Sequence, residues 1–234
     1  MSAATSRWGR QGPRYRRRRP LPALLVLGLL VVLSGFMWTR VFETTEDIEA
    51  ATRCTLPGAP TAAPEPAAEP KPEQPAALGQ MLSRNALDRT TPVPARDVRV
   101  RVLNGNGEAN QAGLISQELT NIGFAPGGEP DNDPIYPNYD LNCHGQIRFG
   151  GAGASQARTL SLMVPCAQLV RDDRTGSSLD LALGSDFKDI KSKPEARQIL
   201  QELKNWVPQG GAEQEVRPPQ VDEELLTAAR DVAC

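Results

Sequence analysis

A run of twenty residues without a charge, residues 20–39, constrains this chain more than any other feature of its sequence. As an α-helix the run would be about 30 Å long, which matches the hydrocarbon thickness of a bilayer. Arg19 and Arg40 bracket it, and residues 1–19 contain seven arginines and no acidic residue. Because basic segments stay on the cytoplasmic side, the sequence predicts a single-pass membrane protein with a cytoplasmic N-terminus and an extracytoplasmic C-terminal part.

A cleaved signal peptide is the alternative interpretation of the same run. Signal peptides have apolar cores of about 7–15 residues and end in small residues at the cleavage site. The run in this chain is longer and closes with Phe36-Met37-Trp38-Thr39, and tryptophan is typical of membrane interfaces. These features favour a transmembrane helix over residues 20–39, and the sequence leaves open whether that anchor is ever cleaved.

The formal net charge of −2 conceals two parts of opposite sign. Residues 1–19 form a basic cytoplasmic tail with a charge of +7, whereas the remaining 19 Lys and Arg stand against 28 Asp and Glu, a balance of −9. The exported part is therefore acidic. Phosphate contacts from basic side chains supply most of the affinity for nucleic acids, so no nucleic-acid partner is predicted.

Composition divides the exported part into a linker, one domain and a tail. Seven prolines fall between Leu56 and Ala77, among alanines and glutamates that do not support a core. Residues 40–95 are therefore predicted to be an extracytoplasmic Pro/Ala/Glu-rich linker. Residues 96–207 are predicted to form a compact domain, and residues 208–234 a polar tail with a short helix at 222–232 that ends in a cysteine.

The hydrophobic periodicity of the domain alternates between strand and helix. The predicted order, strand–helix–strand–helix–strand plus a C-terminal helix, describes a single small α/β domain. Strands are expected at 97–103, 145–149 and 178–183, and helices at 111–122, 155–170 and 194–206.

All four cysteines lie on the predicted exported side: Cys54, Cys143, Cys166 and Cys234. An even number of cysteines in an oxidising compartment implies disulfides, and three pairings are possible. Because elements adjacent in sequence tend to be adjacent in space, we expect Cys143 to pair with Cys166 and Cys54 with Cys234.

The turn after the first strand is the candidate ligand-binding site, and its members are Asn104, Gly105, Asn106, Gly107 and Asn110. Backbone N–H groups at the start of the following helix favour a carboxylate, a phosphate or a sugar, to which the asparagines could add hydrogen bonds. A dinucleotide is disfavoured, because Asn110 stands where the third glycine of that motif belongs. The simplest alternative is that the glycines only permit a tight turn.

No catalytic site, metal site or cofactor is predicted. The chain has no Gly-x-Ser-x-Gly motif, and its single histidine, His144, has no identifiable nucleophile or orienting acid. Cys-x-x-Cys spacing is also absent, which disfavours a zinc site. Asp172 and Asp173 lie in an Arg-Asp-Asp-Arg run that is typical of a solvated turn.

The strand and the turn together carry a family resemblance. Val98-Arg99-Val100-Arg101-Val102-Leu103-Asn104-Gly105, followed by a helix that ends in Gly123-Phe124, resembles the LytR C-terminal domain. The resemblance covers about residues 96–190, and the chain is also similar to actinobacterial envelope-integrity proteins, which join one N-terminal membrane anchor to this domain.

This resemblance implies a non-catalytic envelope protein. Together with the predicted topology and the linker, it leads to the hypothesis that the protein maintains cell-envelope integrity by binding a cell-wall polysaccharide. A scaffold for envelope-assembly or cell-division proteins is the alternative, and an envelope enzyme is a third. The sequence does not predict the oligomeric state.

Overall fold

The structure is a computed structural model that describes residues 26–34, 52–58, 78–207 and 219–234. The chain divides into two units, Met1–Thr45 and Glu46–Cys234. In the first unit, residues 26–34 are helical. No helix within the described ranges combines the length and the apolar character needed to cross a membrane. The basic tail, the rest of the predicted anchor and most of the proline-rich stretch lie outside the described residues.

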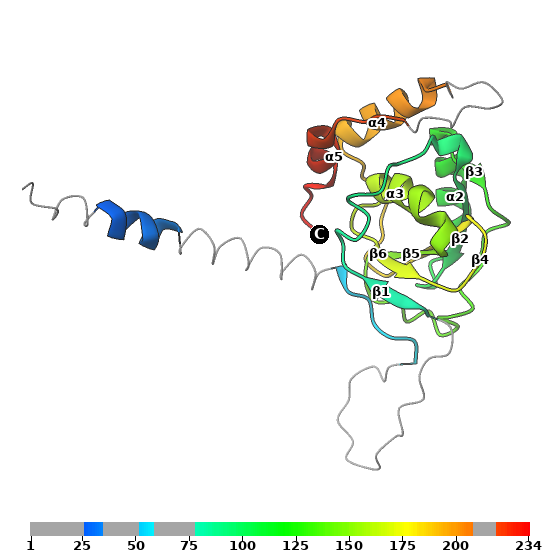
Figure 1. The fold of residues 1–234 in the computed structure, drawn as a ribbon. Coiled ribbons are helices and arrows are strands. Elements are labelled where there is room, and N and C mark those ends of the chain that lie inside the picture. Colours follow the sequence, from blue (N-terminus) through cyan, green and yellow to red (C-terminus); the bar gives the residue numbers. More distant parts are fainter. Residues whose placement is uncertain (1–25, 35–51, 59–77, 208–218) are drawn as a thin grey trace, which may run out of the picture. The chain divides into compact units, whose positions relative to one another are not determined.

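A seven-stranded mixed sheet forms the centre of the second unit (Figure 1). The strand order is β1–β6–β5–β7–β2–β3. β3 pairs with the start of β2, and β4 pairs with its end. β5 and β6 are parallel, as are β7 and β2, whereas β5 runs antiparallel to β7 and β1 antiparallel to β6. The strands are β1 (Gln80–Leu82), β2 (Arg99–Asn104), β3 (Ala125–Pro126), β4 (Asp131–Asn132), β5 (Gly145–Phe149), β6 (Gln168–Arg171) and β7 (Leu179–Leu183).

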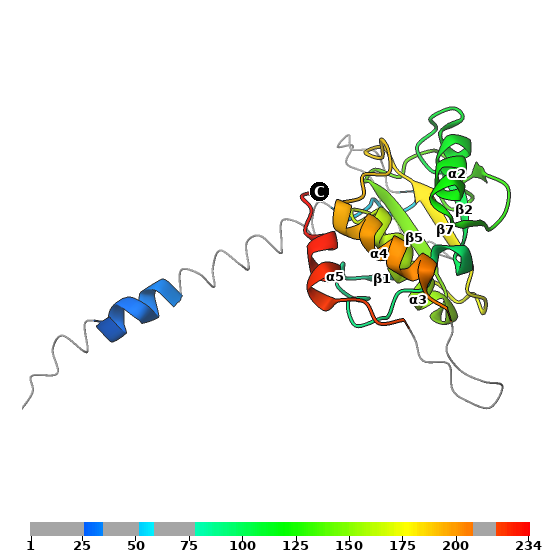
Figure 2. The same cartoon turned by 90° about the horizontal axis from the view of Figure 1, so that it is seen from above.

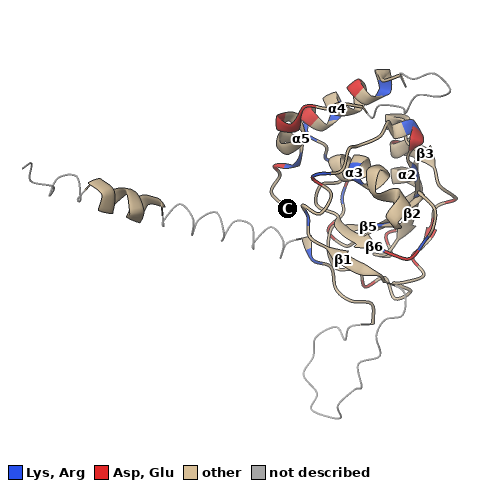
Figure 3. Cartoon of the chain, viewed as in Figure 1, with Lys and Arg blue, Asp and Glu red and all other residues tan. Residues whose placement is uncertain are grey.

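Among the described residues of this unit, helices α2 to α5 accompany the sheet, and α5 packs on α4 as an outer layer (Figure 2). α2 ends at Ile122 and is capped by Gly123, whose φ of 113° lets its N–H reach the carbonyls of Leu119 and Thr120. α5 begins after Asp222, whose carboxylate accepts the N–H groups of Glu224 and Leu225. Figure 3 shows that charged residues recur along α4 and α5. The helices are α2 (Gln111–Ile122), α3 (Ala154–Met163), α4 (Pro194–Asn205) and α5 (Glu223–Arg230), and Ala95–Asp97 and Gly151–Gly153 are 3-10 turns.

Alternation along the strands separates two cores, because successive side chains point to opposite faces of a sheet. On β5, Ile147 and Phe149 join the larger core, which the helices complete with residues such as Leu119, Leu160 and Ile199. We call this side the helix face. The opposite side, the loop face, has a smaller core of eight residues: Cys54, Leu78, Leu103, Tyr136, Leu141, Cys143, Val170 and Ala182.

A buried ion pair lies on the loop face. The Nη1 and Nη2 atoms of Arg148 donate to the two carboxylate oxygens of Asp133 at 2.8 and 2.6 Å, and their side chains are 2% and 0% exposed. Arg148 also donates to Gln146 Oε1 at 3.0 Å, and its guanidinium carbon lies 5.6 Å from the centre of the Tyr136 ring. Such a bidentate pair with further hydrogen bonds satisfies charges that burial would otherwise penalise.

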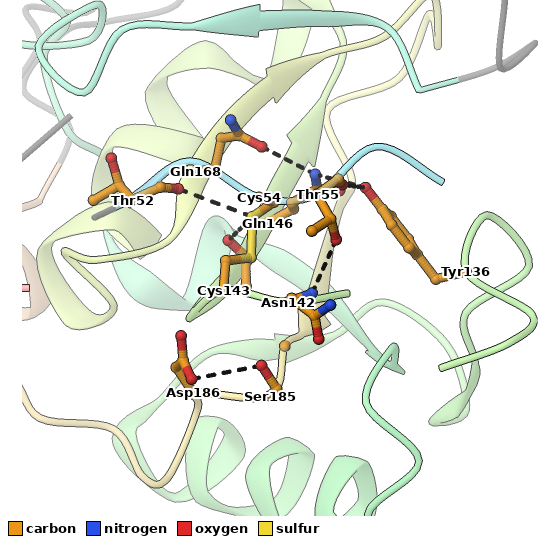
Figure 4. Close-up of a disulfide and its surroundings, with 12 residues drawn as sticks. Thr52, Cys54, Thr55, Tyr136, Asn142, Cys143, Gln146, Gln168, Ser185 and Asp186 are labelled. Atoms are coloured by element: carbon orange, nitrogen blue, oxygen red, sulfur yellow. Dashed lines mark hydrogen bonds between the residues drawn. A yellow bond between two sulfur atoms is a disulfide. The ribbon is translucent and has the colours of Figure 1, made fainter. Parts of the chain in front are cut away.

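The polar network continues from the ion pair through Gln146 to the segment 52–58, and Figure 4 shows the part from Gln146 to Thr55. Gln146 Nε2 donates to Gln168 Oε1 at 3.0 Å and to the Tyr136 hydroxyl at 3.3 Å. That hydroxyl donates to the carbonyl oxygen of Thr55 at 2.6 Å. Burial raises the pKa of Tyr136 to about 12, against a smaller lowering effect of the hydrogen bond with Gln146.

This arrangement corrects the expected extent of the linker. Residues 52–58 and 78–95 fall inside the 40–95 segment, yet Cys54, Leu78 and Leu87 are buried, and β1 forms an edge of the sheet. Their short apolar runs give no periodic signal, and they become part of the domain only because β6 and the loop face offer them partners.

The second predicted helix is also corrected, since α3 ends at Met163 and the chain then forms β6. Val164 precedes Pro165 and has left the helical region, with φ −125° and ψ 67°, as expected for a residue before proline. β6 lies between β1 and β5. The mixed α/β class is confirmed, but the order contains more strands than were predicted.

The predicted disulfide pairing is wrong. Cys54 pairs with Cys143, and Cys166 pairs with Cys234. Cys143 lies in the loop-face core beside Cys54 (Figure 4), whereas Cys166 follows Val164, which belongs to the helix-face core. Proximity in sequence failed as a guide because Cys143 and the turn around Cys166 belong to opposite faces of the sheet.

Candidate functional site

The turn after β2 is held together by its own asparagines. Asn104 Oδ1 accepts the backbone N–H of Asn106 at 3.3 Å and that of Gly107 at 2.8 Å. Asn106 Oδ1 accepts the N–H of Glu108 at 2.9 Å. Three backbone N–H groups of the turn, those of Asn106, Gly107 and Glu108, are therefore already bonded within it.

Asn106 also ties this turn to the loop that follows β7. Its Nδ2 donates to the Gly184 carbonyl at 2.8 Å and to Gln111 Oε1 at 3.0 Å. Gln111 in turn donates to the carbonyl of Phe187 at 3.2 Å. Asn104 and Asn106 therefore hold the turn in place, and their role as ligand contacts stays a prediction.

The two glycines of the turn have a local structural explanation. A Cβ atom on Gly105 would lie 2.9 Å from Leu141 Cδ2 and 3.0 Å from the Leu183 carbonyl oxygen. Gly107 has a φ of +80°, and a Cβ there would lie 3.2 Å from the side chain of Tyr139. Both positions therefore favour glycine because of backbone conformation and close packing.

A hollow of about 500 Å³ opens beside this turn at the start of α2. Asn110 enters the helix with a φ of 61°, and β4 places Asn132 opposite Asn104. The side-chain amides of Asn110 and Asn132 are exposed and make no hydrogen bond within the described part of the chain. The lining residues are Asn104, Asn110, Ala112, Gly113, Leu114, Pro130, Asp131 and Asn132.

A second hollow of about 650 Å³ shares Asp131 with the first. In its wall the Asp180 carboxylate accepts from Arg101 Nε at 3.1 Å and from Arg174 Nη2 at 2.7 Å. Burial by itself would raise the pKa of Asp180, but the hydrogen bonds from Arg101 and Arg174 outweigh it and lower that pKa. Asp172 also accepts from Arg174, so it is engaged in an ion pair rather than free for acid–base chemistry.

Sequence reasoning located the turn but missed Asp131 and Asn132. Both lie in a stretch without hydrophobic periodicity, and only the pairing of β4 with β2 places them beside Asn104. Within the described residues, no group of three or more His, Cys, Asp or Glu side chains is arranged to hold a metal ion.

Comparison with known proteins agrees with this fold. Residues 97–187 match the family model described as LytR cell envelope-related transcriptional attenuator. The chain is 38% identical over 197 residues to "Cell envelope integrity protein Cei" of Mycobacterium tuberculosis, a match that covers 83% of this chain and 85% of that protein. The chain belongs to the LytR C-terminal domain family.

A solved structure also resembles the domain. It is the soluble domain of a conserved hypothetical secreted protein from Mycobacterium marinum, with a TM-score of 0.58 and 35% sequence identity. The match covers 67% of this chain and 99% of that one.

The part that matches the LytR C-terminal domain model contains the asparagine turn and β2 to β7, but neither β1, α4 nor α5. Each disulfide joins one cysteine inside the matched region to one outside it, Cys54 to Cys143 and Cys234 to Cys166. The LytR C-terminal domain of this protein is therefore covalently linked to both flanking segments.

Proposed function

We propose that this protein is a membrane-anchored, non-catalytic component of the cell envelope that binds a cell-wall glycopolymer through the hollow at the start of α2. The family and the relative called a cell envelope integrity protein support the envelope assignment. The observation that carries the binding proposal is that two unengaged amides, those of Asn110 and Asn132, line the same hollow.

The chemistry of the hollow suits a sugar. An amide side chain offers one acceptor oxygen and two donor hydrogens, and sugar hydroxyls both donate and accept. The Leu114 side chain, which is 65% exposed, adds an apolar surface of the kind that the C–H faces of a pyranose require. The balance of −9 beyond residue 19 disfavours strongly anionic polymers and leaves neutral polysaccharides as the expected class.

The test is co-sedimentation of the full-length protein, in a neutral detergent, with actinobacterial cell wall before and after its polysaccharide is removed. We expect saturable binding that depends on the polysaccharide. Replacing Asn110 by Gly and Asn132 by Ala together should weaken binding about tenfold, since each hydrogen bond contributes about 0.5–1.5 kcal/mol. Gly is chosen at position 110 because it tolerates the positive φ.

Asn121→Ala is the matched control, because Asn121 is an exposed asparagine on the last turn of the same helix. Equal retention of the double variant and the control would refute binding at this hollow. Retention that survives removal of the polysaccharide would refute the glycan as ligand.

A scaffold for envelope-assembly proteins is the second candidate. A separate hollow of about 380 Å³ near the Cys166–Cys234 disulfide favours it, because apolar residues such as Met163, Phe187 and Val232 line part of that surface. Crosslinking of the full-length protein in its native membrane should then join it to an envelope-assembly protein. Cells that carry the Asn110/Asn132 variant should also keep an intact envelope, and the two results together would support the scaffold.

A further inference from the structure

A cavity of about 220 Å³ lies near the β1 edge of the sheet, and two arginines line it. It lies between residues 52 and 53, β1 with the turn that follows it, and the start of β6. Arg53 and Arg84 both line it, together with Ser83 and Gln168, and no carboxylate does so within the described residues. In a domain that is acidic overall, two arginines at one cavity without an acid form a local concentration of positive charge.

The donors of these two arginines are largely unused. Arg53 is exposed and makes no hydrogen bond to any described residue. Arg84 donates from Nη2 to the carbonyl oxygen of Arg230, but its Nε is buried and has no partner in the described structure. Buried donors are normally satisfied by protein, water or a ligand, so the Nε of Arg84 can donate to a bound acceptor.

The positive charge extends behind the cavity. Asp88 accepts from Arg158 Nη1 at 2.8 Å and also from Arg230 Nη1. The side chains of Arg158 and Arg230 are only 2% and 9% exposed, and the Nε of each is buried and without a described partner. The Asp88 carboxylate thus pairs with two buried arginines, and Arg84 interacts electrostatically with both Asp88 and Arg230.

The remaining charges near this cluster do not neutralise it. Arg84 is repelled by Arg230 and attracted by Asp88 and Asp231. Burial, followed by repulsion from Arg230, lowers the pKa of both Arg84 and Arg158. An additional anion at the cavity would reduce this repulsion and supply acceptors for the unused N–H groups.

We propose that the cavity between Arg53 and Arg84 binds a phosphate group. Guanidinium groups bind phosphate oxygens through paired, charge-assisted hydrogen bonds, and the Ser83 hydroxyl adds a donor that no described residue occupies. The phosphate can belong to a soluble phosphate ester or to a phospholipid headgroup, and the chemistry of recognition is the same. This site is distinct from the proposed glycan hollow and does not depend on it.

The experiment measures the melting temperature of the full-length protein in a neutral detergent, with inorganic phosphate or glycerol phosphate added at constant ionic strength. Constant ionic strength removes general screening from the comparison. We expect saturating ligand to raise the melting temperature by about 5 °C. Arg53→Gln should weaken the apparent affinity about tenfold, as expected for the loss of one charge-assisted contact.

Arg89→Gln is the matched control, because Arg89 is an exposed arginine a few residues after Arg84 with no described partner. Arg53 is replaced rather than Arg84, because Arg84 donates to the Arg230 carbonyl whereas Arg53 makes no hydrogen bond to a described residue. The absence of a phosphate-dependent shift in every arm, or a shift of equal size in Arg53→Gln and Arg89→Gln, would overturn the proposal.

Two further arms distinguish the sources of the phosphate. Mixed micelles contain either phosphatidylglycerol or diacylglycerol, which lacks the phosphate. A shift with phosphatidylglycerol but not with diacylglycerol or free glycerol phosphate assigns the site to a lipid headgroup. A shift with free glycerol phosphate that matches the lipid arm assigns it to soluble phosphate esters.

Discussion

On one face of the sheet, α2, α3 and α4 cover an apolar core, whereas the other face is closed by loops over a buried ion pair and a disulfide. The helix face is held by side chains that repeat at helical and strand spacing, such as Leu160 in α3 and Leu181 in β7. The loop face depends on particular partners, Arg148 with Asp133 and Cys54 with Cys143.

This difference predicts how strongly a single substitution destabilises each face. Burial of apolar surface is roughly additive, so the helix face can lose one contact and keep the rest. A buried charge is different, because removal of its partner leaves the full desolvation penalty uncompensated. We therefore expect the loop face to be more sensitive to single polar substitutions.

The largest effect is expected from Asp133→Ala, which leaves Arg148 charged and buried without its partner. The free energy of unfolding should fall by about 3–5 kcal/mol. Arg101→Gln is the control, because the Arg101 side chain is 39% exposed in its pair with Asp180, and exposed pairs contribute about 0–1 kcal/mol. Urea unfolding of both variants measures the difference.

A double replacement sharpens the same prediction. Combining Arg148→Met with Asp133→Leu removes both charges, and we expect it to recover part of the stability lost in Asp133→Ala. The recovery is incomplete because Gln146 Oε1 and the Ile135 N–H lose their partners. If Asp133→Ala costs no more than Arg101→Gln, the loop face does not depend on its ion pair.

The next effect concerns the disulfides. Replacing Cys54 and Cys143 by serine should cost about 2–5 kcal/mol, the range for native bridges in small secreted domains. Hydrogen exchange should accelerate at Asn142, whose N–H is bonded to Thr55 Oγ1 at 3.1 Å, while α3 stays protected. Replacing Cys166 and Cys234 by serine instead should accelerate hydrogen exchange in α5 and leave it unchanged on the loop face.

Non-reducing peptide mapping checks the pairing on which this prediction rests. It should recover the peptides that contain Cys54 and Cys143 joined to each other. A peptide that joins Cys143 to Cys166 would contradict the covalent closure of the loop face.

The smallest effect is a pH dependence from Tyr136. Its pKa is raised to about 12 in the folded protein, so folding favours the neutral phenol. That stabilisation is fully present below the ordinary tyrosine pKa of about 10 and is lost as the pH rises towards about 12. The free energy of unfolding should therefore decline across this pH range. Tyr136→Phe should remove that decline, and Tyr139→Phe should retain it. A decline of the same size in Tyr136→Phe would assign it to other groups.

Local patterns predicted the elements that are defined by neighbouring residues. The bounds expected for α2 and β5 are the observed ones, Gln111–Ile122 and Gly145–Phe149. The spacing of apolar residues specifies both elements locally, and the left-handed Gly123 specifies the end of α2. β1 was missed because a three-residue strand has no period to detect. β6 was assigned to a helix because its residues continue an apolar spacing that Pro165 interrupts.

The candidate site shows the same division. The sequence located the turn that contains Asn104 and Asn106, but the tertiary structure shows that their side chains are engaged in holding it. Asn132 joined the site only through the pairing of β4 with β2. Its neighbour Asn110 was identified in advance, because its place at the start of α2 is a local property.

The sequence by itself determined the uncharged run with its basic flank, the family, the mixed α/β class and the principal elements of the domain, because periodicity, charge and turn residues act over short distances. The tertiary structure alone decided the disulfide partners, the inclusion of residues 52–58 and 78–95, and the surroundings of Arg53 and Arg84. Those features depend on which face of the sheet each segment reaches, and no local pattern encodes that choice because it arises from contacts between residues far apart in the chain.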